Sequence, residues 1–296
     1  MRFSIGIFSS IVLPLAVAAQ TNSQPGTVEL PIKLRHGDLF VETSINKSRP
    51  LSFKLDTGFG VTTLHPDLVS ELNLRHNGHL TIVGIAGEEQ AETYGGASFD
   101  FHGLSYEPRR VAVLPSESRR RGRHRDGILG AGFFRRFVVE IDFATQQMRL
   151  YAPAEFNYTG KGEAIPLSFK SDTPIVDAIL VPVGHAPIAG RFEIDTGCDD
   201  GICLGHDFVA ANHLGKTNSE PAGIKRGVGG AAQFQQGDMA ELRLGGFTAK
   251  KPSTTFFMEG SPAGEGQAGH IGLGSLEQFR VIFDYSRKRM ILEPRS

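Results

Sequence analysis

Several features that mark common protein classes are scarce or missing from this chain. Its 296 residues include two cysteines and no tryptophan, and the charges nearly cancel to a formal net charge of −1. A chain with so little net charge lacks the electrostatic signature of nucleic-acid binding. The Cys-x-x-Cys, His-Glu-x-x-His, P-loop and Gly-x-Ser-x-Gly motifs are also absent. Their absence argues against redox, zinc-peptidase, nucleotide-binding and serine-hydrolase sites.

Long hydrophobic runs are lacking as well. Residues 5–17 are mainly apolar, but they are too few, and too interrupted by Ser, Gly and Pro, to span a membrane. Arg2 precedes this run, and small residues from Ala16 to Ala19 follow it, which is typical of a secretory signal peptide. We therefore expect residues 1–19 to be removed, and the protein to be periplasmic or extracellular.

The scattered residues that could hold a cofactor form no convincing pattern. His76 and His79 are separated by Asn77-Gly78, a dipeptide typical of turns, so we expect no metal site there. The glycine-rich run 127–132 lacks the βαβ surroundings of a dinucleotide fold, and we interpret it as a turn packed against a strand. No cofactor and no metal are expected.

Two short stretches stand out against this background. Residues 53–58 and 192–197 each begin as an alternating apolar run, typical of a half-buried strand, and each ends in Asp-Thr-Gly. The aspartates are Asp56 and Asp195. One such tripeptide alone would be interpreted as an ordinary turn, so the flanking sequence decides its meaning.

The flanking sequences match in the same order in both halves. Each Asp-Thr-Gly is followed by a short apolar strand and a short helix, then a glycine-containing segment, then an apolar-apolar-Gly element before a final strand. The matched blocks are 60–72 with 201–214, 83–87 with 226–230, and 127–142 with 270–284. Four blocks in one order indicate an internal duplication.

This duplicated pattern resembles the aspartic peptidases of the pepsin and retropepsin class, most of all bacterial chains in which two retropepsin-like lobes are fused. The resemblance covers nearly all of the chain after residue 19. It implies a mainly β fold of two retropepsin-like β-barrel lobes, related by a pseudo-two-fold axis, with an active-site cleft between them. Pro153, Gly160 and Gly162 mark a boundary, so we expect lobes at 20–151 and 165–296 and a linker at 152–164.

Short strands and few helices are expected. Strands are predicted at 28–34, 39–45, 51–55, 165–169, 175–183 and 191–194, and short helices at 66–74, 132–136, 207–214 and 275–278.

The resemblance also implies roles for individual residues. Asp56 and Asp195 would face each other and hydrolyse peptide or protein substrates with a shared water molecule. Thr57 and Thr196 would brace the two aspartate loops, while Gly58 and Gly197 would let the loops turn. The flaps would contain Gly84, Ile85, Ala86, Gly87, Gly227, Gly229 and Gly230. Because the two lobes already form an internal pseudo-dimer, a monomer is expected.

Some residues depart from the family pattern. Phe59 and Cys198 follow the Asp-Thr-Gly motifs, where pepsin-like enzymes usually have Ser or Thr and retroviral ones a small residue, and the flap tip has no Tyr. Two functions are therefore weighed: an aspartic endopeptidase, and a weakly active or inactive fold of the same type that binds peptide or glycan. Retention of both complete Asp-Thr-Gly motifs favours the endopeptidase.

Two further segments carry expectations. Cys198 and Cys203 could form a disulfide in an exported protein, or could be two small buried apolar side chains. The segment 109–125 contains seven arginines and is expected to be an exposed loop.

Overall fold

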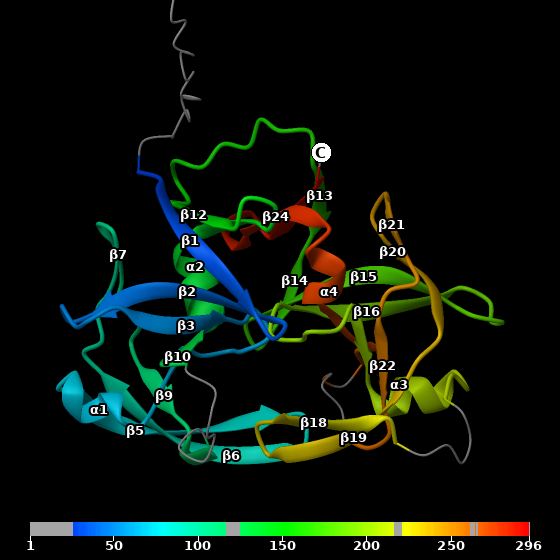
Figure 1. Ribbon diagram of the computed structural model, residues 1–296, viewed down its shortest axis with the longest axis horizontal. Helices are drawn as coiled ribbons and strands as arrows, with labels where there is room; N and C mark the ends of the chain where they lie inside the picture. The colour runs from blue at the N-terminus through cyan, green and yellow to red at the C-terminus, as the bar shows by residue number, and fades with distance from the viewer. Residues whose placement is uncertain (1–25, 117–124, 216–220, 261–263, 265, 296) are drawn as a thin grey trace, which may run out of the picture.

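The computed structural model describes residues 26–116, 125–215, 221–260, 264 and 266–295 (Figure 1). The expected signal peptide at 1–19 lies outside these residues, as do Arg119, Arg120, Arg121 and Arg123 of the basic segment. No helix in the described ranges is long and apolar enough to cross a membrane.

Twelve strands lie in the described part of the first half of the chain. They are β1 (Val28–Arg35), β2 (Asp38–Ile45), β3 (Leu51–Leu55), β4 (Thr63–Leu64), β5 (Arg75–Gly84), β6 (Gly87–Gly95), β7 (Phe99–Phe101), β8 (Leu104–Tyr106), β9 (Val111–Val113), β10 (Gly127–Leu129), β11 (Val138–Asp142) and β12 (Gln147–Tyr151).

The second half repeats this organisation. Its strands are β13 (Glu163–Pro166), β14 (Ser168–Lys170), β15 (Thr173–Pro182), β16 (Ile188–Asp195), β17 (Ile202–Leu204), β18 (Gly223–Gly227), β19 (Gly230–Gln236), β20 (Met239–Leu244), β21 (Phe247–Lys250), β22 (Thr254–Phe257), β23 (Gly269–Gly272), β24 (Phe279–Asp284) and β25 (Arg289–Pro294). The helical pieces are α1 (Leu68–Glu71), α2 (Ala131–Arg136), α3 (His206–Ala211), α4 (Leu273–Leu276) and the 3-10 turn η2 (Tyr285–Arg287). The mainly β fold predicted from the sequence is thus confirmed. The predicted strands and short helices form within a few residues of their expected bounds, except that the strand predicted at 165–169 is divided between β13 and β14.

The alternating pattern of the strands explains why they form. In β1, Leu30 and Ile32 are buried, while Glu29 and Lys33 on either side of them and Pro31 between them are exposed, as expected for a strand with one face on the core. The buried side chains of both halves join in one large apolar cluster, which includes Leu55 and Ile194, the residues that directly precede Asp56 and Asp195. The strands that carry the two aspartates are therefore fixed by the core itself.

The strands form two sheets. One contains β18-β19-β22-β17-β23-β16-β15-β20-β21, with β14 on β15. The other follows the order β13-β25-β24-β11-β12-β1-β2-β3-β10-β4-β9-β6-β5, with β7 on β2 and β8 on β7. In Figure 1 this second sheet links the two lobes at the top of the view, where β24 lies near β12 and β1.

The link between the lobes lies on the axis that relates the two repeats. Strands β11 and β24 are counterparts in the duplicated sequence and pair with each other in antiparallel register. Glu140 pairs with Ile282, its own counterpart, and Val139–Phe283 and Ile141–Val281 flank this pair symmetrically. The pseudo-two-fold axis therefore passes through the Glu140–Ile282 pair, and the repeat predicted from the sequence is a symmetry of the structure.

Two interpretations of the sequence need correction. The segment 109–125 is not a single exposed loop, because residues 111–113 form the buried strand β9 and Arg125 is only 9% exposed. The apolar run Val-Ala-Val within the arginines is what forms that strand. His76 and His79 do not flank a turn, because both lie in strand β5.

Candidate active site

Asp56 and Asp195 occupy equivalent places in the two halves. Asp56 directly follows β3, and Asp195 is the last residue of β16. Beside each lies a short parallel strand, β10 along β3 and β23 along β16, which is the glycine-containing element predicted to pack against the aspartate strand. The two residues are 8% and 9% exposed, and the carboxylate of each lies against the glycine of the other's motif. The structure therefore brings together the two aspartates that the sequence singled out.

The threonines of the two motifs bind each other's loop. The backbone N–H of Thr57 donates to Oγ1 of Thr196 at 3.1 Å, and that of Thr196 donates to Oγ1 of Thr57 at 2.9 Å. Each hydroxyl then donates to the carbonyl that precedes the other aspartate, at Ile194 (2.6 Å) and Leu55 (3.0 Å). Both threonines are almost fully buried. Loss of one hydroxyl would leave buried partners unsatisfied, at a cost of about 1–3 kcal/mol for each group.

The glycines allow the two loops to approach closely. A Cβ at Gly58 would lie 2.6 Å from Oδ1 of Asp195, and a Cβ at Gly197 would lie 2.2 Å from Oδ2 of Asp56. Neither glycine has a positive φ, so close approach to the opposite carboxylate, and not an unusual backbone conformation, requires glycine here. The N–H of Gly197 also donates to Oδ1 of Asp195 at 2.7 Å.

A buried lysine lies beside Asp56. Lys54 is two residues earlier on the same strand, so its side chain is on the same side of β3 as Asp56. Its Nζ lies 2.8 Å from Oδ1 of Asp38, 3.7 Å from Oδ2 of Asp56, and 2.9 Å from the carbonyl oxygen of Gly197, to which it donates. One ammonium group thus contacts Asp56 and the loop that carries Asp195.

A buried histidine lies beside Asp195. Nδ1 of His270 is 2.6 Å from Oδ2 of Asp195, and the histidine side chain is 9% exposed. His270 is on β23, where its register partner on β16 is Glu193, itself 7% exposed. Glu193 is the counterpart of Lys54 in the repeat, so the two halves differ in charge two residues before the aspartate.

These contacts give the two aspartates different proton affinities. Burial and the charge of Asp195 raise the pKa of Asp56, and Lys54 only partly opposes this rise. Burial would also raise the pKa of Asp195, but the hydrogen bond and charge of His270, with the charge of Lys54, outweigh it and lower the pKa. Burial likewise tends to lower the pKa of His270, yet Glu193 and Asp195 raise it to about 10. At mildly acidic pH we therefore infer a protonated Asp56, an ionised Asp195 and a cationic His270.

The two flap hairpins meet at their tips. Hairpin β5–β6 has its tip at 84–87 and hairpin β18–β19 has its tip at 227–230; we call these the flap tips. The N–H of Ala86 donates to the carbonyl of Val228, and a Cβ at Gly229 would lie 2.4 Å from the backbone of Gly87. Figure 1 shows the hairpins along the lower edge of the molecule, each reaching toward the other lobe. All seven predicted flap residues lie at this junction.

The flap tips exchange apolar side chains between the lobes. Val228, from the second lobe, belongs to a buried cluster of the first lobe against which Phe59 packs. Ile85, its counterpart in the first lobe, packs against a cluster of the second lobe that contains Cys198 and Cys203. Phe59 and Cys198 depart from the family pattern. Phe59 packs against the cluster that contains Val228, and Cys198 belongs to the cluster on which Ile85 packs. The structure has both cysteines as free, buried thiols and not as a disulfide.

Removing the exchanged side chains is expected to loosen the flap tips. We expect Ile85→Ala combined with Val228→Ala to raise amide exchange in 84–87 and 227–230 about tenfold, because local opening then exposes less apolar surface. Exchange measured by mass spectrometry checks this. The control is Ile224→Ala, which removes an apolar side chain from the same hairpin that is already 56% exposed. Equal exchange rates in both variants would show that the tips are not held by these contacts.

Four charged residues around the aspartates were not predicted from the sequence: Lys54 and His270, which contact the aspartates, and Asp38 and Glu193, which act on these two cations. A signal existed for two of them, since Lys54 and Glu193 stand two residues before an aspartate on a strand and so share its side. Asp38 and His270 reach the site only through pairing with other strands, which the sequence pattern does not reveal.

Comparison with known proteins agrees with this geometry. Residues 41–133, which contain Asp56 and the first flap, match the family model described as aspartyl protease. No curated protein matches the chain. Among solved structures, the aspartic proteinase from Irpex lacteus is similar with a TM-score of 0.57 at 14% sequence identity, over 91% of this chain and 98% of that one. So low an identity shows the fold alone. The family match over residues 41–133 and the shared two-lobed fold both agree with the resemblance to aspartic peptidases of the pepsin and retropepsin class.

Proposed function

We propose that the protein is an exported aspartic endopeptidase that hydrolyses peptide bonds with a water molecule activated between Asp56 and Asp195. The observation that carries the proposal is that two buried carboxyl groups, one from each repeat, each lie against the opposite aspartate loop, and that crossed hydrogen bonds of Thr57 and Thr196 brace these loops. Peptide hydrolysis needs a base for the water and an acid for the substrate. Two carboxyl groups that share one proton supply both.

The ionic partners suggest which aspartate has which role. Asp195, held ionised by His270, accepts a proton from the attacking water. Asp56, whose pKa is raised by burial and by Asp195, holds a proton and donates it in a hydrogen bond to the scissile carbonyl oxygen. Lys54 contacts Asp56 and the Gly197 carbonyl without taking part in proton transfer. Hydrolysis is then expected at acidic to near-neutral pH, while the pair holds one proton.

The substrate follows from the flap hairpins. An extended peptide can pair its main chain with exposed strand edges of hairpins, whatever its sequence. Both flap tips must separate to admit a peptide, because they contact each other directly. We therefore propose an unstructured peptide or protein segment as substrate, with the protein acting as a monomer of two lobes, 20–151 and 165–296, joined by a linker at 152–164.

Export is proposed from the apolar leader at residues 1–19. N-terminal sequencing of the protein from its own host tests it, and an intact Met1 in the mature protein would contradict it.

A peptide-library digest tests the proposed activity. The mature protein is incubated with the library between about pH 3 and 7, with and without a statine-type mimic of the tetrahedral transition state, which should bind far more tightly than substrate. We expect cleavage that the mimic stops. The alternative, a module that binds peptide or glycan without hydrolysis, predicts no turnover at any pH from a folded protein.

A further inference from the structure

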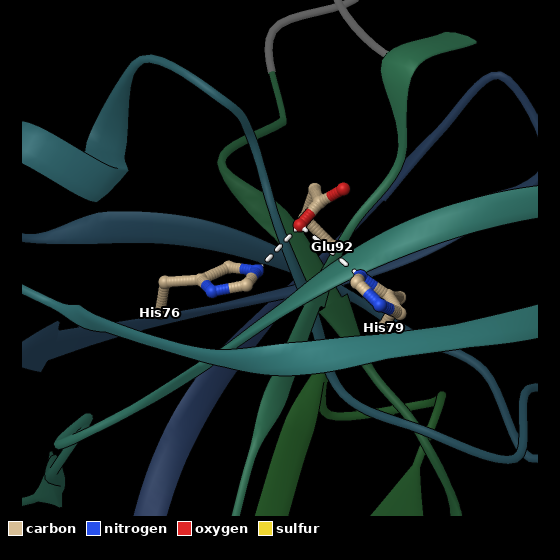
Figure 2. Close-up of side chains that lie close together, drawn as sticks. All are labelled: His76, His79 and Glu92. Atoms are coloured by element: carbon tan, nitrogen blue, oxygen red, sulfur yellow. Dashed lines mark hydrogen bonds and ion pairs between the residues drawn. The ribbon is translucent and has the colours of Figure 1, made fainter.

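A group of three potential metal ligands lies on the first flap hairpin, away from the aspartate pair. His76 and His79 are on β5 and Glu92 is on β6. Figure 2 shows the carboxylate of Glu92 between the two imidazoles. Nε2 of His76 is 2.5 Å and Nδ1 of His79 is 3.7 Å from Oε2 of Glu92, and the three donor atoms all lie within 4.8 Å of one another.

A β-bulge places the two histidines on one side of the hairpin. Residues three apart on a regular strand have side chains on opposite faces. Here the register changes between His76 and Gly78, with His76 opposite Tyr94 and Gly78 opposite Thr93, so that Asn77 is an extra residue. An extra residue reverses the alternation beyond it, and a bulge of this kind re-aims a side chain. The Asn77-Gly78 dipeptide, which suggested a turn, forms the bulge instead, and Gly78 has a φ of +128°.

The neighbouring groups fix part of this arrangement. The ring of Tyr94 packs edge-on against His76, with centroids 5.4 Å apart, and His79 is the direct register partner of Glu92. All three side chains are about half exposed or more, which leaves room for solvent ligands.

We infer that His76, His79 and Glu92 form a binding site for a divalent transition-metal ion, with zinc as the best match, that ties β5 to β6 near the base of the flap hairpin. Two imidazoles and one carboxylate are a common three-residue ligand set for zinc, with water completing the coordination. Ligand atoms around a tetrahedral zinc ion lie about 3.3 Å apart. The present separations of 2.5 and 3.7 Å bracket that value, so small rotations of exposed side chains suffice. Magnesium, which prefers oxygen ligands, should bind poorly.

Calorimetric titration of the metal-stripped mature protein with ZnCl2 at about pH 7.5 tests the inference. The test variants are His76→Ala combined with His79→Ala, and Glu92→Gln. The control, His102→Ala combined with His185→Ala, also removes two imidazoles, both from exposed turns. We expect one zinc equivalent that binds at least tenfold more weakly to each test variant and unchanged to the control, with MgCl2 binding negligible. ZnCl2 should also slow amide exchange across β5 and β6 in the wild type and in the control, and in neither test variant.

Other outcomes would overturn the inference. They are zinc affinity equal in wild type and in the His76/His79 double variant, binding no tighter for ZnCl2 than for MgCl2, or unchanged exchange in the hairpin at saturating zinc. The substitutions are at exposed positions, so the variants should remain folded, and thermal unfolding verifies this. None of these measurements depends on peptide hydrolysis, so they stand apart from the proposed function.

Discussion

Asp56→Asn and Asp195→Asn are each expected to lower the rate of peptide hydrolysis by about 10³-fold or more, because each removes the acid or the base of a shared proton-transfer step. The double variant should be little slower than either single one, since groups that act as a unit are strongly non-additive. Rates on one peptide found in the library digest measure the effect. The control is Asp177→Asn, which makes the same chemical change at an exposed position of β15.

The two variants should differ in stability although they share the loss of activity. Asparagine at position 56 replaces a carboxyl group that we infer to be protonated, so the folded state loses little. At position 195 it removes the ionised partner of His270 and leaves a buried cation with one carboxylate fewer. Removing one partner of a buried ion pair typically lowers the free energy of unfolding of the protein by about 3–5 kcal/mol. The assigned roles would be refuted if Asp56→Asn were less stable than Asp195→Asn, or if Asp56→Asn cleaved the peptide at the wild-type rate.

The aspartates could be predicted from the sequence because their immediate surroundings are continuous in the chain. An apolar strand, Asp-Thr-Gly and a second short strand occur twice in matching order, so strand burial and the repeat are both visible without knowledge of the pairing. The crossed bonds between Thr57 and Thr196 follow from the same symmetry, since each repeat contributes the same groups. Local pattern and symmetry were therefore sufficient for the centre of the candidate site.

The groups around this centre depend on contacts between strands that no local pattern specifies. His270 reaches Asp195 only because β23 runs parallel to β16 in a register that puts His270 beside Glu193. The histidines of the flap hairpin share a side only because of a bulge in the pairing of β5 with β6. Arg125 was likewise not predictable from local sequence. It belongs to a basic run that was expected to be exposed, but it is buried, and its charge partly opposes the rise in the pKa of Asp56.

The two residues that depart from the family pattern make contacts that explain their apolar character. Phe59 and Cys198 stand where pepsin-like enzymes usually have Ser or Thr, whose hydroxyls can form hydrogen bonds with the aspartates. Here the two side chains instead belong to the apolar clusters that contain or contact Val228 and Ile85. The cations Lys54 and His270 contact the carboxylates of Asp56 and Asp195. A full charge acts more strongly on a carboxylate than a neutral hydroxyl does, so the pH dependence of hydrolysis should depend on these two cations.

His270→Gln is expected to move the acid limb of the pH profile of kcat/KM to higher pH by about one unit or more. Glutamine can still donate a hydrogen bond, but it removes the positive charge that lowers the pKa of Asp195. The groups that act on the imidazolium are Glu193 and Asp195 on β16 and Cys198 in the loop that follows β16. Without the cation, Asp195 binds a proton at a higher pH, and the base is lost earlier as the pH falls.

The same substitution should change stability in a defined pH window. The pKa of His270 is raised to about 10, so its charge stabilises the folded state fully below its ordinary value of 6.5, and this contribution is lost as the pH rises toward 10. The pKa of Asp195 is lowered, so its contribution is present above the ordinary value of 3.8 and is lost as the pH falls. The melting temperature of His270→Gln should therefore fall furthest below that of the wild type between about pH 4 and 6.5, and approach it at alkaline pH.

A matched surface pair separates an electrostatic role from a structural one. His206 lies 3.2 Å from Asp207, but both side chains are exposed, so His206→Gln should alter neither the pH profile nor the melting temperature. If His270→Gln lowered the melting temperature while the acid limb stayed in place, His270 would only support the fold. A shifted acid limb in a variant that keeps most of its activity at the new optimum would instead identify His270 as the positioning residue that keeps Asp195 ionised and ready to accept a proton from water.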